Sequence, residues 1–402
     1  MTSTASAPLV DEDAAPPRLR IVIGADTYPP DVNGAANFAS RLAVGLAGRG
    51  HDVHVLCPST DARSLTESHT GITVHRIASV GTPVHPTFRI CRPMLAFRAA
   101  QDLLSELAPD LVHIQAHFVV GRALAASASR RRIPVVATNH FMPENLHGYL
   151  PVPKTLRAAV SRLGWWDLRR VLRAAQVVTA PTQQAVRLLA ENGVPSAVAV
   201  SCGIDLTRFP TPAPASDRLV PHVLFVGRLD EEKRVGELLR AVHRLRGDVR
   251  VRVEIVGDGK CRQAWQNLAG RLGIAGDVTF HGHIDEDALI AAYLRADVFC
   301  MPGVAELQSL ATMDALAAGK PVVAADAMAL PHLVRPGETG WLYPPGDTAA
   351  LADRLRRLLV DPSARVRMGA AGRVLIAQHT MESTLDRFET MYRSVAVRLP
   401  LA

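Results

Sequence analysis

The sequence predicts an α/β protein built from two doubly wound domains, each with a parallel sheet between layers of helices. Short apolar runs alternate with segments of helical apolar period along most of the chain. This alternation is typical of parallel sheets with helices on both faces. It stops once, at a stretch rich in Pro, Ala and Ser (210–218), and then restarts. Such a composition favours a linker between two domains.

Buried strands are predicted where a short apolar run is bounded by turn residues. In the first half a helical pattern covers 36–50, and the predicted strands are 19–25, 51–58, 110–115, 133–140 and 175–181. In the second half the predicted strands are 222–228, 251–259, 277–283, 297–302 and 320–326. The segment 350–397 is predicted to be helical throughout.

These patterns set the expected domain organisation. We expect a tail at 1–18, an N-terminal domain at 19–209, the linker, and a C-terminal domain at 219–385. The rest, 386–402, is expected to form a C-terminal helix that can pack back on the N-terminal domain.

Composition restricts the class of protein. The chain has 402 residues, 48% of them hydrophobic, enough for two cores, and no run of about 20 apolar residues that could span a membrane. The N-terminus has neither a basic start nor an apolar segment, so a solvated tail is expected rather than a signal peptide. The five cysteines form no C-x-x-C pair, which argues against a disulfide framework or a zinc site and favours a reducing cytoplasm.

The charge balance bears on the partners. A formal net charge of +7 could favour nucleic acid, anionic lipid or a phosphorylated small molecule. Aromatic residues make up only 5% of the chain, and no motif of a nucleic-acid-binding module occurs. No nucleic-acid partner is therefore expected.

In open parallel sheets, ligands bind beyond the carboxyl ends of the strands. Two such domains place the natural site in the cleft between them. The loops that directly follow predicted strands are therefore the first places to look for functional residues.

One such loop precedes a helix that is predicted to end at Gly319. Its carboxylate, Glu306, can accept hydrogen bonds from sugar hydroxyls, and the amides around Gln308, Ser309 and Leu310 would form an anion site at the helix start. Asp314 follows about 12 Å further along the axis and could hold a ribose, with a diphosphate between the two acids. Alternatively, Glu306 is a helix-entry acid and Asp314 a satisfied polar residue.

Two further loops carry groups suited to phosphate. The segment FVGRLDEEK supplies Arg228 and Lys233, which can neutralise a diphosphate, or which simply belong to a charged helix start. In the first domain Asn33 and Gly34 lie between a strand and a helix, where small residues let amides approach phosphate. The pattern is not G-x-G-x-x-G, so a dinucleotide cofactor is disfavoured.

These motifs, in this order, resemble the retaining nucleotide-sugar glycosyltransferases of glycosyltransferase family 4, which have the GT-B fold. The resemblance covers nearly the whole chain after the tail. It includes VSCGIDLTRF before the linker, and then FVGRLDEEK, VGDG, FHGHIDEDALIAAYLRADVF, an E-x7-E-like element, GKPVVAAD and RPGETGWLYPPGD. It implies two Rossmann-like domains facing a central cleft, an N-terminal acceptor domain and a C-terminal nucleotide-sugar domain.

The resemblance also implies roles for individual residues. Glu306 would bind the donor sugar, Asp314 would stand where the family has a ribose-binding Glu, and Arg228 and Lys233 would bind the diphosphate. Gly34 would lie against the diphosphate from the N-terminal domain, and His283 with Ile284 would border the base. Two departures concern donor recognition: Asp314 is one methylene shorter than Glu, and Ser309 replaces a usual Gly, with Leu307-Gln308 before it.

Residues of the N-terminal domain are candidates for the acceptor side. His117 and His140 follow predicted strands, in loops that touch sugar or acceptor in the family, although both could simply cap strand ends. Glu144 is a candidate for positioning the acceptor hydroxyl. His113, inside its strand, is expected to be a core residue.

The segment 151–175 combines Trp165 and Trp166 with six Lys and Arg residues. A basic amphipathic helix with aromatic residues can lie in a membrane interface, or it can be a packed helix with a solvated basic face. The segments TNHFMPEN and ELQSL resemble glycerolipid glucosyl- and mannosyltransferases that act on diacylglycerol. A cytoplasmic protein is expected, either free or peripheral on the inner face of the plasma membrane.

The reaction implied is retaining transfer of a hexose to an acceptor hydroxyl, with no cofactor and no metal. Asp285, in the sequence DED, is expected to be a helix N-cap rather than a metal ligand. UDP-glucose is the first candidate donor and GDP-mannose the second, and a diacylglycerol-type lipid is the candidate acceptor. The alternatives are a soluble or polysaccharide acceptor, a nucleotide-sugar 2-epimerase, a phosphorylase-like enzyme, or a non-catalytic sugar-nucleotide-binding protein.

Overall fold

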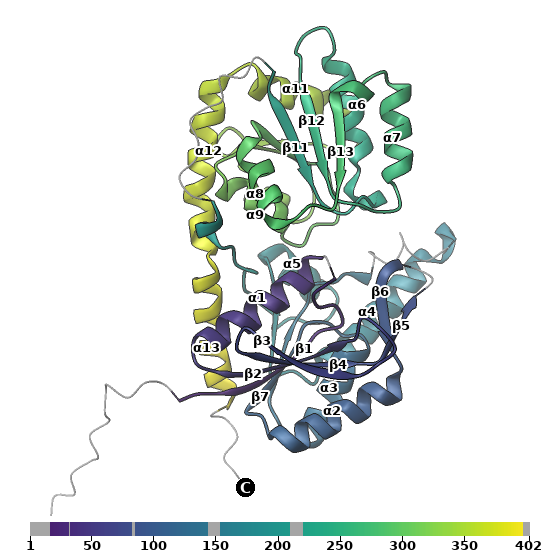
Figure 1. Ribbon diagram of the computed structural model, residues 1–402, viewed down its shortest axis with the longest axis vertical. Coiled ribbons are helices and arrows are strands. Elements are labelled where there is room, and N and C mark those ends of the chain that lie inside the picture. Colours follow the sequence, from purple (N-terminus) through teal and green to yellow (C-terminus); the bar gives the residue numbers. More distant parts are fainter. Residues whose placement is uncertain (1–16, 32, 83–84, 144–152, 210–219, 397–402) are drawn as a thin grey trace, which may run out of the picture.

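The computed structural model forms two α/β domains, one above the other in Figure 1. It describes residues 17–31, 33–82, 85–143, 153–209 and 220–396. The linker expected at 210–218 and most of the tail expected at 1–18 lie outside these residues. Both domains are doubly wound and Rossmann-like, which confirms the predicted fold class.

The N-terminal domain contains an eight-stranded sheet with the strand order β10-β9-β8-β7-β1-β2-β4-β3. All neighbouring strands are parallel except β3 and β4. The strands are β1 (Arg20–Gly24), β2 (Asp52–Pro58), β3 (Leu65–His69), β4 (Ile72–Ile77), β7 (Leu111–Ile114), β8 (Val135–Thr138), β9 (Val177–Ala180) and β10 (Val198–Ala199). The α-helices are α1 (Gly34–Gly48), α2 (Pro93–Leu107), α3 (Val119–Arg130), α4 (Arg157–Leu172) and α5 (Gln183–Glu191).

The C-terminal domain contains a six-stranded parallel sheet with the order β13-β12-β11-β14-β15-β16. Its strands are β11 (His222–Val226), β12 (Arg252–Val256), β13 (Val278–Gly282), β14 (Val298–Met301), β15 (Val322–Ala325) and β16 (Gly340–Tyr343). Its α-helices are α6 (Val235–Leu245), α7 (Arg262–Arg271), α8 (Glu286–Arg295), α9 (Leu310–Ala317), α10 (Leu330–Leu333), α11 (Thr348–Leu359) and α12 (Pro362–Ile376).

Each sheet has one point where the direction of strand addition reverses. In the N-terminal sheet β1 lies between β2 and β7, and in the C-terminal sheet β11 lies between β12 and β14. The helices that follow the two innermost strands then leave on opposite faces, which opens a crevice at the carboxyl ends. The sites expected from the topology are therefore the ends of β1 and β7 and the ends of β11 and β14.

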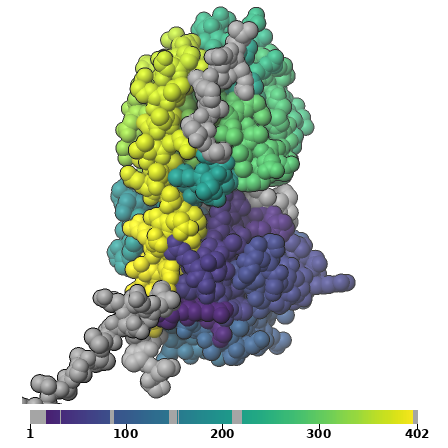
Figure 2. Space-filling model, turned by 60° about the vertical axis from the view of Figure 1, so that its left-hand side comes forward, coloured from purple at the N-terminus to yellow at the C-terminus, as the bar shows by residue number. Residues whose placement is uncertain are grey.

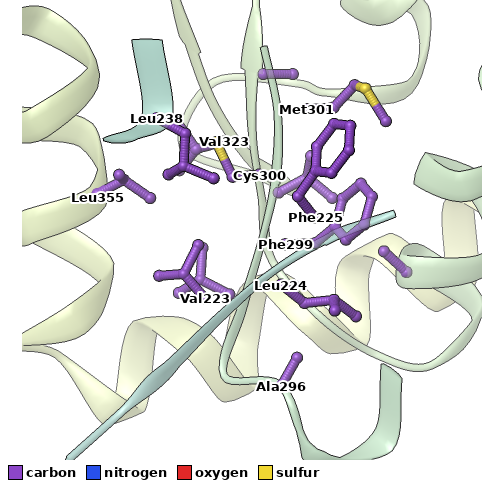
Figure 3. Close-up of a cluster of buried hydrophobic side chains, with 14 of the residues drawn as sticks. Val223, Leu224, Phe225, Leu238, Ala296, Phe299, Cys300, Met301, Val323 and Leu355 are labelled. Atoms are coloured by element: carbon purple, nitrogen blue, oxygen red, sulfur yellow. The ribbon is translucent and has the colours of Figure 1, made fainter. Parts of the chain in front are cut away.

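Apolar strands form the core of each domain. In the C-terminal domain the central strands carry fully buried side chains on both faces, including Phe225 from β11 and Phe299 from β14 (Figure 3). Such near-continuous apolar runs are expected of strands covered by helices on both sides.

The last helix of the chain completes the N-terminal domain. α12 packs on the C-terminal domain, a short 3₁₀ turn (Ala377–His379) follows, and α13 (Met381–Ala396) packs on the N-terminal sheet with Phe388 and Tyr392 buried against Ile21 and Phe38. Figure 2 shows this yellow segment running along both domains. The helix begins ahead of the boundary expected at 386.

The chain passes between the domains twice, and the two connections touch. Ile204 donates its N–H to the carbonyl of His379, over 2.8 Å, and the N–H of Met381 donates to the carbonyl of Ile204, over 2.9 Å. These two bonds join the strand-like segment that leaves the N-terminal domain to the turn that returns to it.

Several strands were not predicted. They are the antiparallel strand β3, the strands β4, β10 and β16, and a separate hairpin of β5 (Ser79–Thr82) and β6 (His85–Cys91). Among the described residues, no helix has the length and hydropathy needed to cross a bilayer.

Candidate active site

The predicted functional residues lie beyond the strand ends where the two sheets reverse. Asn33 and Gly34 follow β1, and His117 follows β7. Arg228 follows β11, and Glu306 follows β14. Four loops that are distant in sequence therefore supply the candidate groups, as expected of a site at the switch points of two parallel sheets.

The loops of the two domains meet around the start of α9. The side chain of Gln308 accepts a hydrogen bond from the N–H of Cys202, over 2.8 Å, and donates one to the Ser201 hydroxyl, over 2.7 Å. The hydroxyl of Thr182, after β9, donates to the carbonyl of Leu307 over 2.9 Å. The loop between β14 and α9 is thus hydrogen-bonded to both the N-terminal domain and the connecting segment.

Lys233 and Glu306 form an ion pair at the centre of this region, in which the Lys233 ammonium bonds Glu306 Oε1. The Lys233 side chain is 16% exposed and the Glu306 side chain 11%. A Cβ added at Gly303 would lie only 3.0 Å from Glu306 Oε1, so this glycine leaves the space that the carboxylate occupies. The pair joins two loops that lie 73 residues apart in the sequence.

Arg228 lies on the same loop as Lys233 but has different partners. Its guanidinium donates to Asp230 Oδ2 and to Glu232 Oε1, each over 2.9 Å. With a side chain 37% exposed, it is more accessible to solvent than Lys233. An anion that binds Arg228 must therefore compete with two carboxylates of its own loop.

Glycines let two loops of the C-terminal domain pack together. A Cβ added at Gly257 would lie 2.0 Å from the carbonyl oxygen of Gly227, and one added at Gly259 would lie 2.7 Å from the backbone of Leu229. Real side chains cannot occupy those positions, so the VGDG motif fixes the position of the loop that carries Arg228.

The start of α9 offers backbone donors. Within the described part of the chain, the N–H groups of Ser309, Leu310 and Ala311 have no recorded acceptor. Free amides and the helix dipole both favour an anion at this position. Ser309 itself has φ of 69°, a left-handed conformation that glycine adopts at little cost, and its hydroxyl lies 2.8 Å from that of Thr312.

Asp314 lies in the second turn of α9 and is buried. Its Oδ1 accepts a hydrogen bond of 2.9 Å from Arg208, which the sequence analysis did not select. Burial raises the pKa of Asp314 to about 6, against the lowering effect of the Arg208 and Arg41 guanidinium groups. The helix ends at Ala317 rather than at the predicted Gly319.

The two candidate histidines of the N-terminal domain are neutral at pH 7, because burial lowers the pKa of each to about 4. His117 is buried beside the Phe118 ring, with centroids 4.4 Å apart, and its Nδ1 has no hydrogen-bond partner among the described residues. His140 Nε2 lies 3.0 Å from Gln115 Oε1. Glu144, the acceptor-side candidate, lies outside the described residues.

The remaining predicted residues have structural contacts of their own. Asn33 is the N-cap of α1 and accepts the N–H of Ala36 over 2.9 Å, so its side chain is already used in folding. His283 is exposed after β13, and Ile284 packs against the C-terminal core. A Cβ added at Gly34 would lie 3.8 Å from Leu310, at the contact between the starts of α1 and α9.

Two structural predictions made from the sequence are confirmed. His113 is a fully buried core residue, with Nδ1 2.6 Å from the Tyr392 hydroxyl and Nε2 2.7 Å from that of Thr138. Asp285 is the N-cap of α8 and accepts the N–H of Ala288 over 2.8 Å. Within the described residues, no group of three or more His, Cys, Asp or Glu side chains is placed to hold a metal ion.

Comparison with known proteins gives the family. The pattern of the family described as "Glycosyltransferase Family 4" matches residues 32–208, and that of "Glycosyl transferases group 1" matches residues 213–375. The chain is 30% identical to a GDP-mannose-dependent alpha-mannosyltransferase of Mycolicibacterium smegmatis over 396 residues, 95% of this chain and 99% of that protein.

Two further similarities span almost the whole chain. A phosphatidyl-myo-inositol mannosyltransferase of Mycobacterium leprae is 36% identical over 385 residues, 92% of this chain and 95% of that protein. The solved structure of a sucrose-phosphate synthase from Thermosynechococcus elongatus shares the fold with a TM-score of 0.78 at 22% identity, and the match covers 95% of this chain and 100% of that one. The chain therefore belongs to glycosyltransferase family 4 and has the GT-B fold.

Proposed function

We propose that this chain transfers a hexosyl group from a nucleoside diphosphate sugar to an acceptor hydroxyl, with retention of anomeric configuration and without a metal ion. The observation that carries the proposal is the buried ion pair of Lys233 and Glu306, beside the amides at the start of α9 that have no acceptor within the described parts of the chain. A cation, a set of N–H donors and a carboxylate in one place suit a ligand that has both a diphosphate and sugar hydroxyls.

Departure of the nucleotide is the step that these groups assist. Negative charge grows on the diphosphate as the glycosidic bond breaks, and fixed donors aimed at that charge lower the barrier. The Lys233 ammonium has three donors, so it can bind a phosphate oxygen and remain bonded to Glu306. Arg228 can add a second cation once the diphosphate replaces Asp230 or Glu232 as its partner.

Glu306 is assigned to the donor sugar, as an acceptor of hydrogen bonds from its hydroxyls. The neutral imidazole of His117 can donate one hydrogen bond and accept another, toward either the sugar or the acceptor. The two ring nitrogens of His140 lie 3.0 Å from Gln115 Oε1 and 4.0 Å from Cys202 Sγ, so His140 must exchange one of these partners to bond a ligand. The attacking hydroxyl approaches on the face that the diphosphate leaves, and a phosphate oxygen takes its proton. Trapping a covalent glycosyl-enzyme would contradict this route.

The relatives change the order of the candidate donors. The relative from M. smegmatis is named as GDP-mannose-dependent, so GDP-mannose becomes the first candidate and UDP-glucose the second. The test incubates the protein with each donor and a lipid extract, in excess EDTA, and measures released nucleotide and the anomeric configuration of the product. Lipid-dependent release of GDP with an α-linked mannolipid is the expected result.

The same experiment separates the alternatives. Epimerised sugar nucleotide without any acceptor would support a 2-epimerase. Binding of GDP or UDP with no transfer to lipid or soluble acceptors would support a non-catalytic protein. A transfer that is lost in EDTA and restored by magnesium would contradict the metal-free mechanism.

The acceptor is proposed to be a lipid reached at the inner face of the plasma membrane, by way of the outer side of α4. Leu163 is 64% exposed and Trp166 50% exposed there, while the adjacent Trp165 is buried. Arg162 and Arg170 are exposed on the same side, and the Arg170 guanidinium carbon lies 5.7 Å from the centre of the Trp166 ring. Exposed aromatic and aliphatic groups among arginines suit an anionic membrane interface.

We expect replacement of both Leu163 and Trp166 by Ser to lower binding to anionic phospholipid vesicles by about tenfold or more, because apolar area inserted in the interface is lost. Flotation of the protein with vesicles measures the bound fraction, which should also fall as salt rises. Val374→Ser is the matched control, since Val374 is 72% exposed on α12 of the other domain. Equal binding by the double variant and the control would contradict the α4 surface.

A further inference from the structure

A cluster of charged residues lies where the first connection enters the C-terminal domain. Arg208 ends a short 3₁₀ turn of that connection (Leu206–Arg208). Its Nη1 donates to Asp314 Oδ1 over 2.9 Å, and its Nη2 pairs with Glu286 at the start of α8. The Arg208 side chain is 12% exposed and the Asp314 side chain 11%, so this guanidinium–carboxylate pair is largely removed from water.

The C-terminal core fixes the position of Arg208. Its guanidinium carbon lies 5.2 Å from the centre of the Phe209 ring. Phe209 is fully buried and packs edge-on against Tyr293 of α8, with ring centroids 5.7 Å apart. The arginine therefore belongs to a connecting segment by sequence but packs against the C-terminal core.

The two carboxylate oxygens of Asp314 differ in their hydrogen bonding. Oδ1 accepts the bond from Arg208, whereas within the described part of the chain the structure records no hydrogen bond to Oδ2. Oδ2 is not among the fully buried polar atoms of the described residues that lack a partner, so it lies in the 11% of the side chain that stays exposed. An oxygen in this state is suited to accept a hydrogen bond from a ligand hydroxyl.

The charges around Asp314 come from three elements besides its own. Arg208 on the connection and Arg41 on α1 are the cations, while Glu286 on α8 opposes ionisation. Burial raises the pKa of Asp314 to about 6, and the two guanidinium groups lower it. The carboxylate is thus mostly ionised at pH 7, and Arg208 is the only one of these cations with a hydrogen bond to it that the structure records among the described residues.

We propose that Arg208 is a positioning residue for the pentose of the donor nucleotide: it holds Asp314 by one oxygen, so that the other accepts a hydrogen bond from a ribose hydroxyl. This inference rests on the proposed function, because it assumes a nucleotide in the site. Arg208 itself does not contact the nucleotide. Its contribution is to fix the direction of an acid that is shorter than the usual glutamate.

A ribose contact has a signature that a general structural role lacks. A site built to bond a hydroxyl discriminates against the analogue that lacks it, because its buried oxygen is then left unpaired. The wild-type protein should therefore bind its nucleotide, GDP or UDP, at least about tenfold more tightly than the deoxy analogue that lacks the bonded hydroxyl. That analogue is either the 2′-deoxy or the 3′-deoxy form. Removing the positioning group should reduce this ratio.

The experiment measures the dissociation constants of GDP, UDP and their two deoxy analogues by calorimetry, for the full chain and a double-mutant cycle. The variants are Arg208→Met, Asp314→Asn and the combination. Each single change should lower the ribo-to-deoxy ratio to within about threefold of one. The combination should have no further effect, because the two residues act through one hydrogen bond to the ribose.

Arg354→Met is the matched control. Arg354 is likewise a partly buried arginine that pairs with an acid, Asp353, and it lies 5.2 Å from the centre of the Trp341 ring. It belongs to α11, and the ratio should stay at the wild-type value. If Arg208→Met does not fold, Arg208→Lys keeps the charge without the fork of donors and should give an intermediate ratio.

Failure of the inference can be told from failure of the proposed function. If the wild type binds neither GDP nor UDP, the proposed function fails and the inference fails with it. If the wild type binds nucleotide but does not discriminate, the inference alone is overturned. The inference alone is also overturned if Arg208→Met weakens the binding of ribonucleotides and deoxynucleotides by equal factors. It is overturned as well if the effect of Arg208→Met on the ribo-to-deoxy ratio adds to that of Asp314→Asn.

Discussion

Lys233 and Glu306 are each other's partner in the site that we propose for a ligand bearing phosphates and hydroxyls. An ion pair this buried is retained only if both charges stay compensated. Until a donor arrives, the pair keeps both groups charged and in place. A bound diphosphate can then add a hydrogen bond to the lysine, and a sugar hydroxyl can add one to the glutamate. Sequence reasoning selected both residues, but for separate roles.

We expect Lys233→Ala to lower kcat by about 10²–10³-fold, because one fixed donor to the leaving group is lost. Steady-state kinetics with the preferred donor measure this, and thermal unfolding shows whether the variant is folded. Lys260→Ala is the control, since Lys260 is a more exposed lysine of the same domain, 3.9 Å from Glu231. Unchanged turnover in a folded Lys233→Ala protein would contradict the diphosphate assignment.

A second residue gives a prediction about pH. Asp26 follows β1 and accepts the N–H groups of Val120 and Gly121 at the start of α3, over 2.8 and 3.2 Å. Burial nonetheless raises its pKa from 3.8 to about 6. The folded chain then binds this proton more tightly than the unfolded chain, so the free energy of unfolding falls as pH rises from about 4 through 6.

Asp26→Asn removes that titration. From pH 4 to 7, urea unfolding should show the wild type losing up to about 3 kcal/mol relative to the variant. Asp314, whose pKa is shifted in the same direction, is present in both proteins and cancels from the difference. Parallel stability curves would show that Asp26 has an ordinary pKa.

At the scale of elements, the start of α9 combines backbone N–H groups that have no acceptor among the described residues with an unfavourable backbone angle. Ser309 has φ of 69°, and its hydroxyl contacts that of Thr312. The sequence analysis noted Ser309 as a departure from a usual glycine, and the angle gives the physical reason for glycine at this position.

Comparison of Ser309→Gly with Ser309→Ala should isolate the backbone cost. Both variants lose the hydroxyl, but only alanine keeps a side chain in the left-handed region, so the glycine variant should be more stable by about 1 kcal/mol. Chemical denaturation measures the difference. Equal stabilities, or a more stable alanine variant, would show that the angle costs nothing.

The elements also show how far sequence reasoning reached. The strands next to the site were predicted because each is a short apolar run between turn residues, which requires only local information. The hairpin of β5 and β6 was not, because His85–Cys91 has a proline and no clear alternation. Loops after strands identified Glu306 and Lys233, since the carboxyl edge of a parallel sheet is where ligands bind.

Pairing between distant residues could not be predicted from one sequence. Arg208 and Asp314 are 106 residues apart, and nothing local tells which acid an arginine will meet. The interdomain bonds of Gln308 were missed for the same reason. The motif VSCGIDLTRF did contain Arg208, so the one available signal was its place in a segment already selected for the family resemblance.

At the scale of the molecule, the two domains depend differently on the last helix, α13, for their apolar cores. Among the residues that the structure describes, the apolar core of the C-terminal domain contains none from α13, whereas the N-terminal core includes Leu385, Phe388, Tyr392 and Val395. Each buried side chain of this kind contributes about 1.5–3 kcal/mol. Together they approach the whole stability of an ordinary domain, about 5–15 kcal/mol.

A chain that ends at Thr380 should therefore keep a folded C-terminal domain and lose the folded N-terminal one. Calorimetry should show a single remaining transition, and limited proteolysis should digest residues before the connection first. A chain that ends at Ala396 is the control and should retain the full unfolding enthalpy. Two intact transitions in the shorter chain would show that α13 is dispensable for folding.

The position of α13 also matters for biosynthesis. The ribosome releases the N-terminal half first, but the helix that covers Ile21 and Phe38 is synthesised only after the whole C-terminal domain. The newly made N-terminal domain therefore exposes an apolar surface to water while the C-terminal domain is synthesised. Chaperones can bind that surface throughout this time. The domain that is synthesised first is thus the last to complete its folding.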